Sequence, residues 1–217
     1  MDQETLNMIS SFTSKLLRKN FGKGPQSCQS TLCGKYLVTY IRGFISPMEE
    51  ILIQQGQNNQ VDKARTVIIN HIIEELKDVE ESYHDWNFPN NSGVIIFVMD
   101  DEVEKCASDQ NVDFKRLETE VARLSQLVQK IPDQIYVYPL SSSLYLIERK
   151  GILIPIEKSL IKKGFAEELK ITKDELEKTY FHRYGKFDNI FNTTIKDIFI
   201  DWNFKEDKSF VAFILGS

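Results

Sequence analysis

A cationic, glycine-rich loop is the stretch whose residue types come closest to a binding site. Residues 18–25 read Arg-Lys-Asn-Phe-Gly-Lys-Gly-Pro, so two glycines lie next to three basic side chains. Turns at glycines expose backbone N–H groups, and N–H groups beside cations are one way of holding an anion. The candidate contacts for an anion or a partner protein in this loop are Arg18, Gly22, Lys23, Gly24 and Pro25.

The position of this loop after an expected helix offers a second interpretation. A helix C-terminus carries negative partial charge, which repels anions and attracts basic side chains. A glycine directly after a helix commonly caps it in the left-handed conformation. The same residues are therefore also explained as the C-terminal cap of the first helix, and both interpretations stay open.

Arg42 and Glu49 are a second pair of charged candidates, located before and inside the next expected helix. The charge signs recur 108 residues later, in Lys150 and Glu157. Such a pair can belong to a binding surface, or it can be an ordinary surface or half-buried ion pair worth about 0–1 kcal/mol. We include Arg42 and Glu49 in the candidate binding set.

Residues that usually carry catalysis or hold metals form no recognisable set. The three histidines, at positions 71, 84 and 182, are far apart and show no zinc-ligand spacing. The chain has no G-x-S-x-G, no phosphate-binding P-loop and no G-x-G-x-x-G motif. Its three cysteines, at 28, 33 and 106, include no Cys-x-x-Cys and indicate reduced thiols. We therefore expect no catalytic residues, no metal and no cofactor.

The elements that must position these residues come from an internal repeat. Residues 43–56 align without a gap on residues 151–164, an offset of 108, and six of the fourteen positions are identical. The tetrapeptide Asp-Trp-Asn-Phe at 85–88 recurs at 201–204, an offset of 116. Self-similarity of this kind indicates tandem modules. We place the first module at residues 1–105 and the second at residues 110–217.

The first module should contain three helices and four strands. Apolar residues at helical spacing predict a helix to about Asn20, followed by a hairpin of residues 27–32 and 36–44. Ser46 and Glu49 flank Pro47 as in a capping box, which predicts a short helix to Gly56. A longer helix over 61–79 and a hairpin around 89–93, closed by a strand at 94–99, complete the module.

The second module repeats this order. We expect a helix over 114–131, a hairpin of 135–139 and 144–150, and a final hairpin of 199–204 and 210–215. Thr172 and Glu175 form a second capping-box pattern, which predicts a helix starting there and extending to Ile195. Both modules are predicted to be α+β, each a mainly antiparallel sheet covered by helices on one face.

Composition excludes several classes of protein. The 217 residues carry a formal net charge of −5, and both halves are acidic overall, which argues against a nucleic-acid partner. No uninterrupted apolar run is longer than six residues, the length of residues 94–99, which is far below the ~18–20 residues of a membrane-spanning helix. The acidic N-terminus lacks the features of a secretory signal. We therefore expect a cytoplasmic protein without a direct membrane span.

The first module resembles the MpsC-like family of bacterial domains. The resemblance covers roughly residues 5–102 and rests on three elements: Gly-Lys-Gly-Pro at 22–25, Arg-Gly-Phe-Ile-Ser-Pro-Met-Glu at 42–49, and the closing strand at 93–100. The second module looks like a diverged copy, because it keeps Gly151, Pro155, Glu157 and Gly164 but lacks the Gly-x-Gly-Pro loop and the arginine.

This resemblance implies an accessory role in membrane transport. The family is named after a Na+-translocating, membrane-potential-generating system, so the chain is expected to be a soluble, non-catalytic accessory or regulatory component of such a system or of bicarbonate transport. Ions cannot cross a bilayer through a chain with no spanning segment. The expected partner is therefore an integral membrane transporter subunit, which would hold the chain at the inner face of the membrane.

Two other functions remain open. A cytoplasmic sensor that binds a small anion is the main alternative, and it rests on the Gly-Lys-Gly loop beside Arg42. An enzyme is a third, because a cleft can gather polar groups that are scattered in the sequence. A homodimer is also a candidate assembly, because each module is expected to have an open sheet edge.

Overall fold

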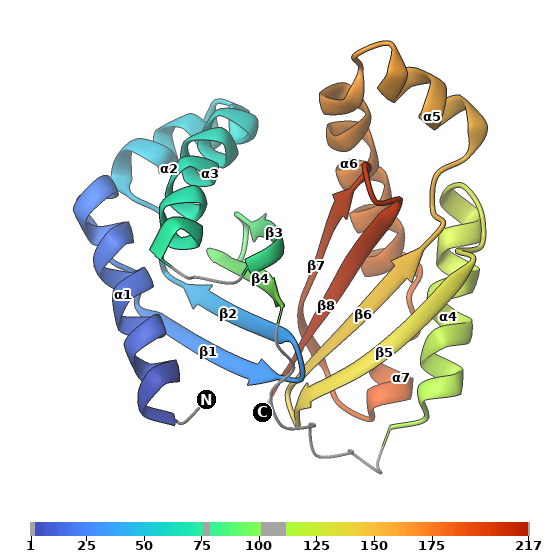
Figure 1. Cartoon of the computed structure of the whole chain (residues 1–217), viewed down its shortest axis with the longest axis horizontal. Coiled ribbons are helices and arrows are strands. Elements are labelled where there is room, and N and C mark those ends of the chain that lie inside the picture. Colours follow the sequence, from blue (N-terminus) through green and yellow to red (C-terminus); the bar gives the residue numbers. More distant parts are fainter. Residues whose placement is uncertain (1–2, 76–78, 101–111, 217) are drawn as a thin grey trace. The chain divides into compact units, whose positions relative to one another are not determined.

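The computed structural model describes residues 3–75, 79–100 and 112–216. The chain divides into two compact units, Met1–Lys105 and Cys106–Ser217. Each unit contains one four-stranded sheet and its own helices (Figure 1). The two units are described separately below.

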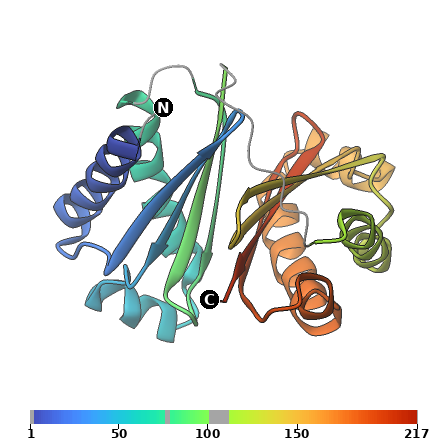
Figure 2. The ribbon, with the colours of Figure 1, turned by 90° about the horizontal axis from the view of Figure 1, so that it is seen from below.

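The first unit is built around an antiparallel sheet with the strand order β1-β2-β4-β3. All of its helices lie on one face of this sheet (Figure 2). Its elements are α1 (Gln3–Phe21), β1 (Ser27–Cys33), β2 (Tyr36–Arg42), α2 (Pro47–Gln54), α3 (Asn58–Glu75), β3 (Val79–Asn87) and β4 (Ser92–Met99).

The second unit has an antiparallel sheet with the equivalent strand order, β5-β6-β8-β7, and again carries its helices on one face (Figure 2). Its elements are α4 (Phe114–Val128), β5 (Gln134–Ser141), β6 (Leu144–Lys150), α5 (Pro155–Lys162), α6 (Ala166–Tyr184), α7 (Asp188–Phe191), β7 (Ile195–Asn203) and β8 (Lys208–Leu215). The predicted α+β class is confirmed.

The repeated Asp-Trp-Asn-Phe tetrapeptide plays the same structural role in both units. The side chain of Asp85 accepts a hydrogen bond from the backbone N–H of Trp86 at 2.7 Å. Asp201 and Trp202 form the same bond at 2.8 Å. Both tryptophans are buried in the core between sheet and helices. This agreement supports the interpretation of the two units as a repeat.

Apolar side chains on the helix-facing side of each sheet form the cores. In the first unit, Leu17 of α1 and Ile72 of α3 pack with Ile41 of β2 and Ile95 of β4. In the second unit the core combines residues from α4, α6, α7 and the sheet. Burial of aliphatic and aromatic surface at these positions supplies the main driving force for folding each unit.

The start of α2 agrees with the sequence prediction. Ser46 is the N-cap, its side chain accepts from the Glu49 N–H at 3.4 Å, and its own N–H donates to the Glu49 carboxylate at 2.8 Å. Pro47 occupies the first turn, where its missing N–H costs no hydrogen bond. The predicted capping box is therefore confirmed.

Three predicted helix boundaries are wrong. The helix predicted to extend to Val79 ends at Glu75, and Val79 instead begins β3. Thr172 does not open a helix, because α6 already begins at Ala166 and the Thr172 hydroxyl donates to the Glu168 carbonyl inside it. This helix also ends earlier than predicted, at Tyr184, and Ile195 begins β7. A capping-box pattern inside a helix is satisfied by bonding to the preceding turn instead.

The cysteines differ from one another. Cys28 is a free thiol, and burial raises its pKa to about 12. Cys33 is disulfide-bonded, so the expectation of a reduced thiol is wrong for this residue. Cys106 lies outside the described residues.

Candidate functional site

The loop after α1 begins with a helix cap. Gly22 adopts a φ of +71°, and its N–H donates to the Arg18 carbonyl at 2.9 Å. This is the left-handed cap that glycine adopts without the steric cost of a Cβ atom. Gly22 therefore has the backbone geometry of a C-terminal helix cap, as the capping interpretation expected.

The rest of the loop is fastened to the segment after β2. The Lys23 ammonium donates to the Ile45 carbonyl at 3.1 Å, and the Gln26 N–H donates to the Arg42 carbonyl at 2.8 Å. Lys23 therefore bonds to the residue that precedes the N-cap of α2. The structure thus brings the two separate sequence motifs, 22–25 and 42–49, to the same end of the first unit.

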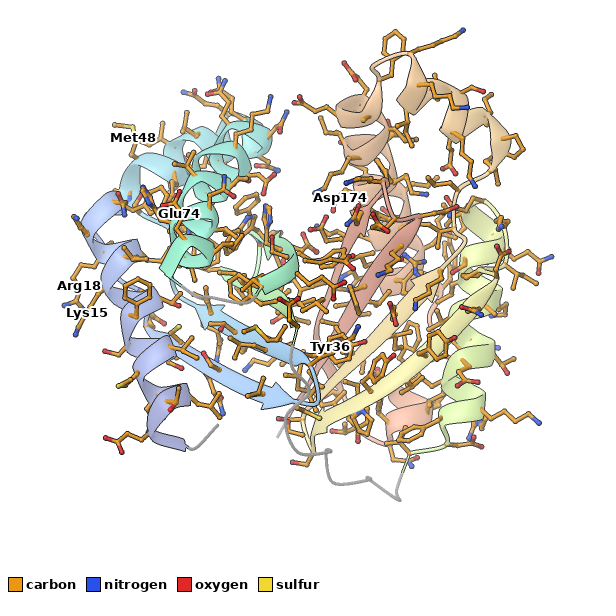
Figure 3. The ribbon with its side chains drawn as sticks, viewed as in Figure 1. Lys15, Arg18, Tyr36, Met48, Glu74 and Asp174 are labelled. Atoms are coloured by element: carbon orange, nitrogen blue, oxygen red, sulfur yellow. The ribbon has the colours of Figure 1, made fainter. Side chains whose placement is uncertain are left out.

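Arg18, Lys23 and Arg42 are exposed around this fastened loop. Figure 3 shows Arg18 and Lys15 extending outward from α1, away from the sheet. A Cβ atom at Gly24 would lie 3.0 Å from Nε of Arg18, so the glycine leaves room for the arginine stem. The three exposed cations and the half-buried Pro25 form the candidate contact surface of this unit.

Glu49 does not pair with Arg42, contrary to one interpretation of the sequence. Its two carboxylate oxygens lie 2.7 and 2.8 Å from Nη2 of Arg65, and Glu49 and Arg65 are both buried. Arg42 is exposed at the end of β2. The expectation of a surface or half-buried ion pair for Glu49 is wrong: the pair with Arg65 is buried and connects α2 with α3. Glu49 therefore joins the two helices and faces away from solvent.

Arg65 is a residue that the sequence analysis did not identify. Its guanidinium carbon lies 4.6 Å from the ring centroid of Phe21, 4.0 Å from that of Phe44 and 5.2 Å from that of Trp86. Its Nη2 also donates to the Phe44 carbonyl at 3.3 Å. Cation–π contacts of this kind are stronger when they are shielded from water.

Burial and the neighbouring carboxylate act on the pKa of Arg65 in opposite directions. Burial lowers the pKa of the Arg65 guanidinium, and the carboxylate of Glu49 offsets only part of this, so the pKa lies below its ordinary value. Within the described residues, Nε and Nη1 of Arg65 and Nε1 of Trp86 have no hydrogen-bond acceptor. The aromatic rings and Glu49 therefore provide most of the compensation for burying this cation.

The second unit contains the equivalent ion pair in altered form. Nζ of Lys173 lies 3.0 Å from the Glu157 carboxylate, and the two residues are 16 positions apart, as are Glu49 and Arg65. The offset between the two pairs is 108, the offset of the repeat. This constant spacing is a sequence signal that could have identified Arg65 as the partner of Glu49, but the sequence analysis considered only Arg42.

Two further buried charges extend the pair in the second unit. Nη2 of Arg149 donates to the Glu177 carboxylate at 2.6 Å, and Nζ of Lys173 lies 3.3 Å from the same carboxylate. Nε1 of Trp202 donates to Glu177 at 3.1 Å. Burial acts to raise the pKa of Glu177, but Arg149 and Lys173 outweigh it and hold the pKa below its usual value.

The first unit has isoleucines at the positions equivalent to Arg149 and Glu177. At the offset of 108, Arg149 corresponds to Ile41 and Glu177 to Ile69, and both isoleucines are buried. The acceptor that Trp202 uses is therefore missing in the first unit, which explains why Nε1 of Trp86 has no partner there. The two cores share one fold but differ in polarity.

These features define a two-unit α+β protein whose units bury related ion pairs beneath their helices and whose first unit presents a basic loop. Among the residues at 3–75, 79–100 and 112–216, no group of three or more His, Cys, Asp or Glu side chains is placed to hold a metal ion. None of the helices within these ranges is long and apolar enough to cross a membrane.

Comparison with known families finds a match within the first unit. Residues 2–101 match the family described as "Na+-translocating membrane potential-generating system (MpsC)". The resemblance inferred from the sequence motifs is thereby confirmed over the first unit, while the second unit lies outside the match. No curated protein and no solved structure gave a match to the chain.

Proposed function

We propose that the chain is a non-catalytic accessory or regulatory component of a bacterial Na+-translocating, membrane-potential-generating system, or of a related bicarbonate transport system. The observation that carries this proposal is the match of residues 2–101 to the MpsC family. The chain then acts in the cytoplasm, at the inner face of the membrane, through an integral membrane subunit.

The basic loop of the first unit is the proposed contact for that subunit. Arg18, Lys23 and Arg42 are exposed, and two hydrogen bonds fasten the loop to the segment before α2. A fastened loop loses little conformational entropy on binding, which favours association. Gly22 and Gly24 shape the loop, while the buried Glu49 holds α2 in place and acts only indirectly.

Co-purification from native membranes tests this proposal. A tagged chain is crosslinked gently in cells, and the membrane and soluble fractions are analysed separately by mass spectrometry. We expect a transporter subunit in the membrane fraction, and we expect the double variant Lys23→Glu, Arg42→Glu to lose it. The matched control is Lys115→Glu, Arg116→Glu, which reverses two exposed charges on α4 of the second unit.

A thermal denaturation curve of each variant separates lost contact from lost folding. If the loop variant folds and still recovers the transporter, the loop is not the contact. Recovery of the chain alone, from the soluble fraction, would favour the small-anion sensor. A thermal-shift screen of phosphate, bicarbonate, nucleotides and organic acids then decides, because a ligand of the native state must raise its stability.

A further inference from the structure

Large apolar side chains are exposed to solvent on α5 of the second unit and just after it. Ile156 is 65% exposed, Phe165 is 48% exposed and Leu160 is also exposed. Ile156 and Leu160 are four residues apart and therefore share one side of the helix. The Phe165 N–H donates to the Leu160 carbonyl at 3.0 Å, which places Phe165 directly at the end of α5.

Lysines accompany this apolar stripe. Lys158 and Lys162 are four residues apart on another side of α5, Lys163 follows the helix, and Lys205 lies in the β7–β8 turn. Lys158 binds Asp207 at 2.8 Å. Lys162, Lys163 and Lys205 form no ion pair with any residue that the structure describes. Their charges are therefore available to a partner.

A shallow hollow lies among three of these lysines. It has a volume of about 240 Å³, and its charged lining consists of Lys158, Lys162, Lys205 and Asp207, the ion-pair partner of Lys158. Its apolar lining comes from Leu153, Ile161 and Phe204. Figure 1 shows α5 and the turn into α6 at one end of the second unit, beyond the end of β6. Cations around an apolar floor suit an anionic, amphipathic partner.

The equivalent helix of the first unit shows that the fold does not require these lysines. On α2, Met48 is 69% exposed and Ile51 is 51% exposed, so exposed apolar residues recur, and Figure 3 shows Met48 at the outer surface. The four positions that correspond to the lysines hold Glu50, Gln54, Gln55 and Pro89. The basic character is therefore specific to the second unit.

We propose that the α5 surface, defined as Ile156, Leu160 and Phe165 with Lys158, Lys162, Lys163 and Lys205, docks on an anionic lipid bilayer. Apolar side chains of a short amphipathic helix insert among the headgroups, and lysines attract anionic lipid phosphates. The long apolar stems of the lysines accompany the insertion while their charges stay at the headgroups. This contact goes beyond the proposed function, because it needs no transporter subunit and lies outside the family match.

Acidic side chains at the edge of the α5 surface should weaken its binding to an anionic membrane. Glu167 and Glu168 in the first turn of α6, and Glu206 beside Lys205, are exposed. They repel an anionic membrane and weaken the attraction of the lysines. Neutralising Glu167 and Glu168 should therefore strengthen binding, which is the opposite direction to neutralising the lysines.

Vesicle flotation of the purified full chain tests the proposal. Vesicles of phosphatidylcholine alone are compared with an equal mixture of phosphatidylcholine and phosphatidylglycerol. We expect binding to the anionic vesicles only, lowered by salt. Lys162→Gln and Lys163→Gln, the residues of the first unit, should each weaken binding roughly fivefold, in keeping with the contribution of one basic residue at a lipid surface.

Two further variants keep the result specific. Leu160→Ser should weaken binding without any change of charge, and Glu167→Gln, Glu168→Gln should strengthen it. Lys115→Gln, Arg116→Gln on α4 is the control with an equal loss of charge away from the α5 surface. Failure of the wild-type chain to bind anionic vesicles would overturn the proposal, and so would equal weakening by the α4 control.

A different class of partner has its own outcome. Retention of the chain on polyglutamate without any binding to anionic vesicles would overturn the bilayer proposal in favour of an acidic protein partner. Co-purification of a transporter subunit through the loop of the first unit is measured separately. Failure of the vesicle experiment therefore leaves the accessory-subunit proposal intact, and the reverse also holds.

Discussion

Arg65 and Lys173 occupy the same place in their units, each 16 residues after the glutamate that it binds. Their buried positive charges are compensated by different neighbours. Arg65 lies against three aromatic rings and binds a single carboxylate, whereas Lys173 lies between the carboxylates of Glu157 and Glu177. A flat guanidinium can stack on rings, while a compact ammonium gains more from several oxygen atoms.

Replacing Arg65 should destabilise the first unit in a graded way. Arg65→Lys keeps the charge but loses the stacking, so we expect a loss of about 1–2 kcal/mol in the free energy of unfolding. Arg65→Met leaves Glu49 buried without its partner, and we expect a loss of about 3–5 kcal/mol. Urea denaturation measures both. Equal stability of Arg65→Lys and the wild type would show that the rings contribute nothing.

The extra ion pair of the second unit should be replaceable by the residues of the first. Glu177→Ile alone leaves Arg149 buried and unpaired, and we expect a loss of about 3–5 kcal/mol. Arg149→Ile, Glu177→Ile reproduces Ile41 and Ile69, and most of that loss should be recovered. A double-mutant cycle by chemical denaturation gives the coupling. If the double variant were less stable than Glu177→Ile, the pair would not be the dominant interaction of Glu177.

Gly93 should be required by the tryptophan that covers it. A Cβ atom at Gly93 would lie 2.1 Å from Cε3 of Trp86, so Gly93→Ala should cost about 1–3 kcal/mol through overpacking. The same substitution should cost less in a Trp86→Phe background, because the smaller ring removes the contact. Gly56→Ala is the control: it has no neighbour within 4 Å and should cost only about 1 kcal/mol, through its φ of +74°. Thermal denaturation compares the wild type with Gly93→Ala, Trp86→Phe, the double variant and Gly56→Ala.

Acid should weaken the second unit partly through Asp207. Burial acts to raise the pKa of Asp207, but Lys158 and the backbone N–H groups of Leu153 and Ile152 outweigh it and hold the pKa below its ordinary 3.8. A lowered pKa in the folded state means that this contribution to stability is present above pH 3.8 and is lost as the pH falls below it. The equivalent residue of the first unit is Asn91, whose side chain accepts from two backbone N–H groups in the same way.

Asp207→Asn is therefore the matched variant for this pH dependence. It keeps the two backbone hydrogen bonds and removes the titrating group. Its stability should fall less steeply than that of the wild type on acidification below about pH 4. Urea denaturation across pH 7 to pH 3 measures the difference, and parallel curves for the two chains would contradict the role assigned to Asp207.

Much of the architecture followed from local patterns in the sequence. The capping box of Ser46 and Glu49, the cap at Gly22 and the apolar face of α1 depend on neighbouring residues, so their spacing predicts them. The start of α6 was missed because Thr172 and Glu175 have the spacing of a cap but lie inside a helix. Local patterns cannot tell a helix start from a helix interior when both satisfy the same hydrogen bonds.

The candidate site also contains features that the sequence revealed and features that only the structure revealed. The sequence analysis selected the loop cations and Glu49 as candidates but paired Glu49 with Arg42, and it did not identify Arg65, the partner that the structure shows. It could not show that Lys23 reaches Ile45, since the two residues are far apart in the chain and no periodicity links them.

The sequence by itself determined the two α+β modules, the repeat and the resemblance of the first module to the MpsC family, because these depend on residue order and short-range spacing. Only the tertiary structure decided which charges are buried and paired. The partner of Glu49 is set by how α2 and α3 pack over the sheet, and burial, which depends on that packing, decides whether a charged residue is a core contact or an exposed surface.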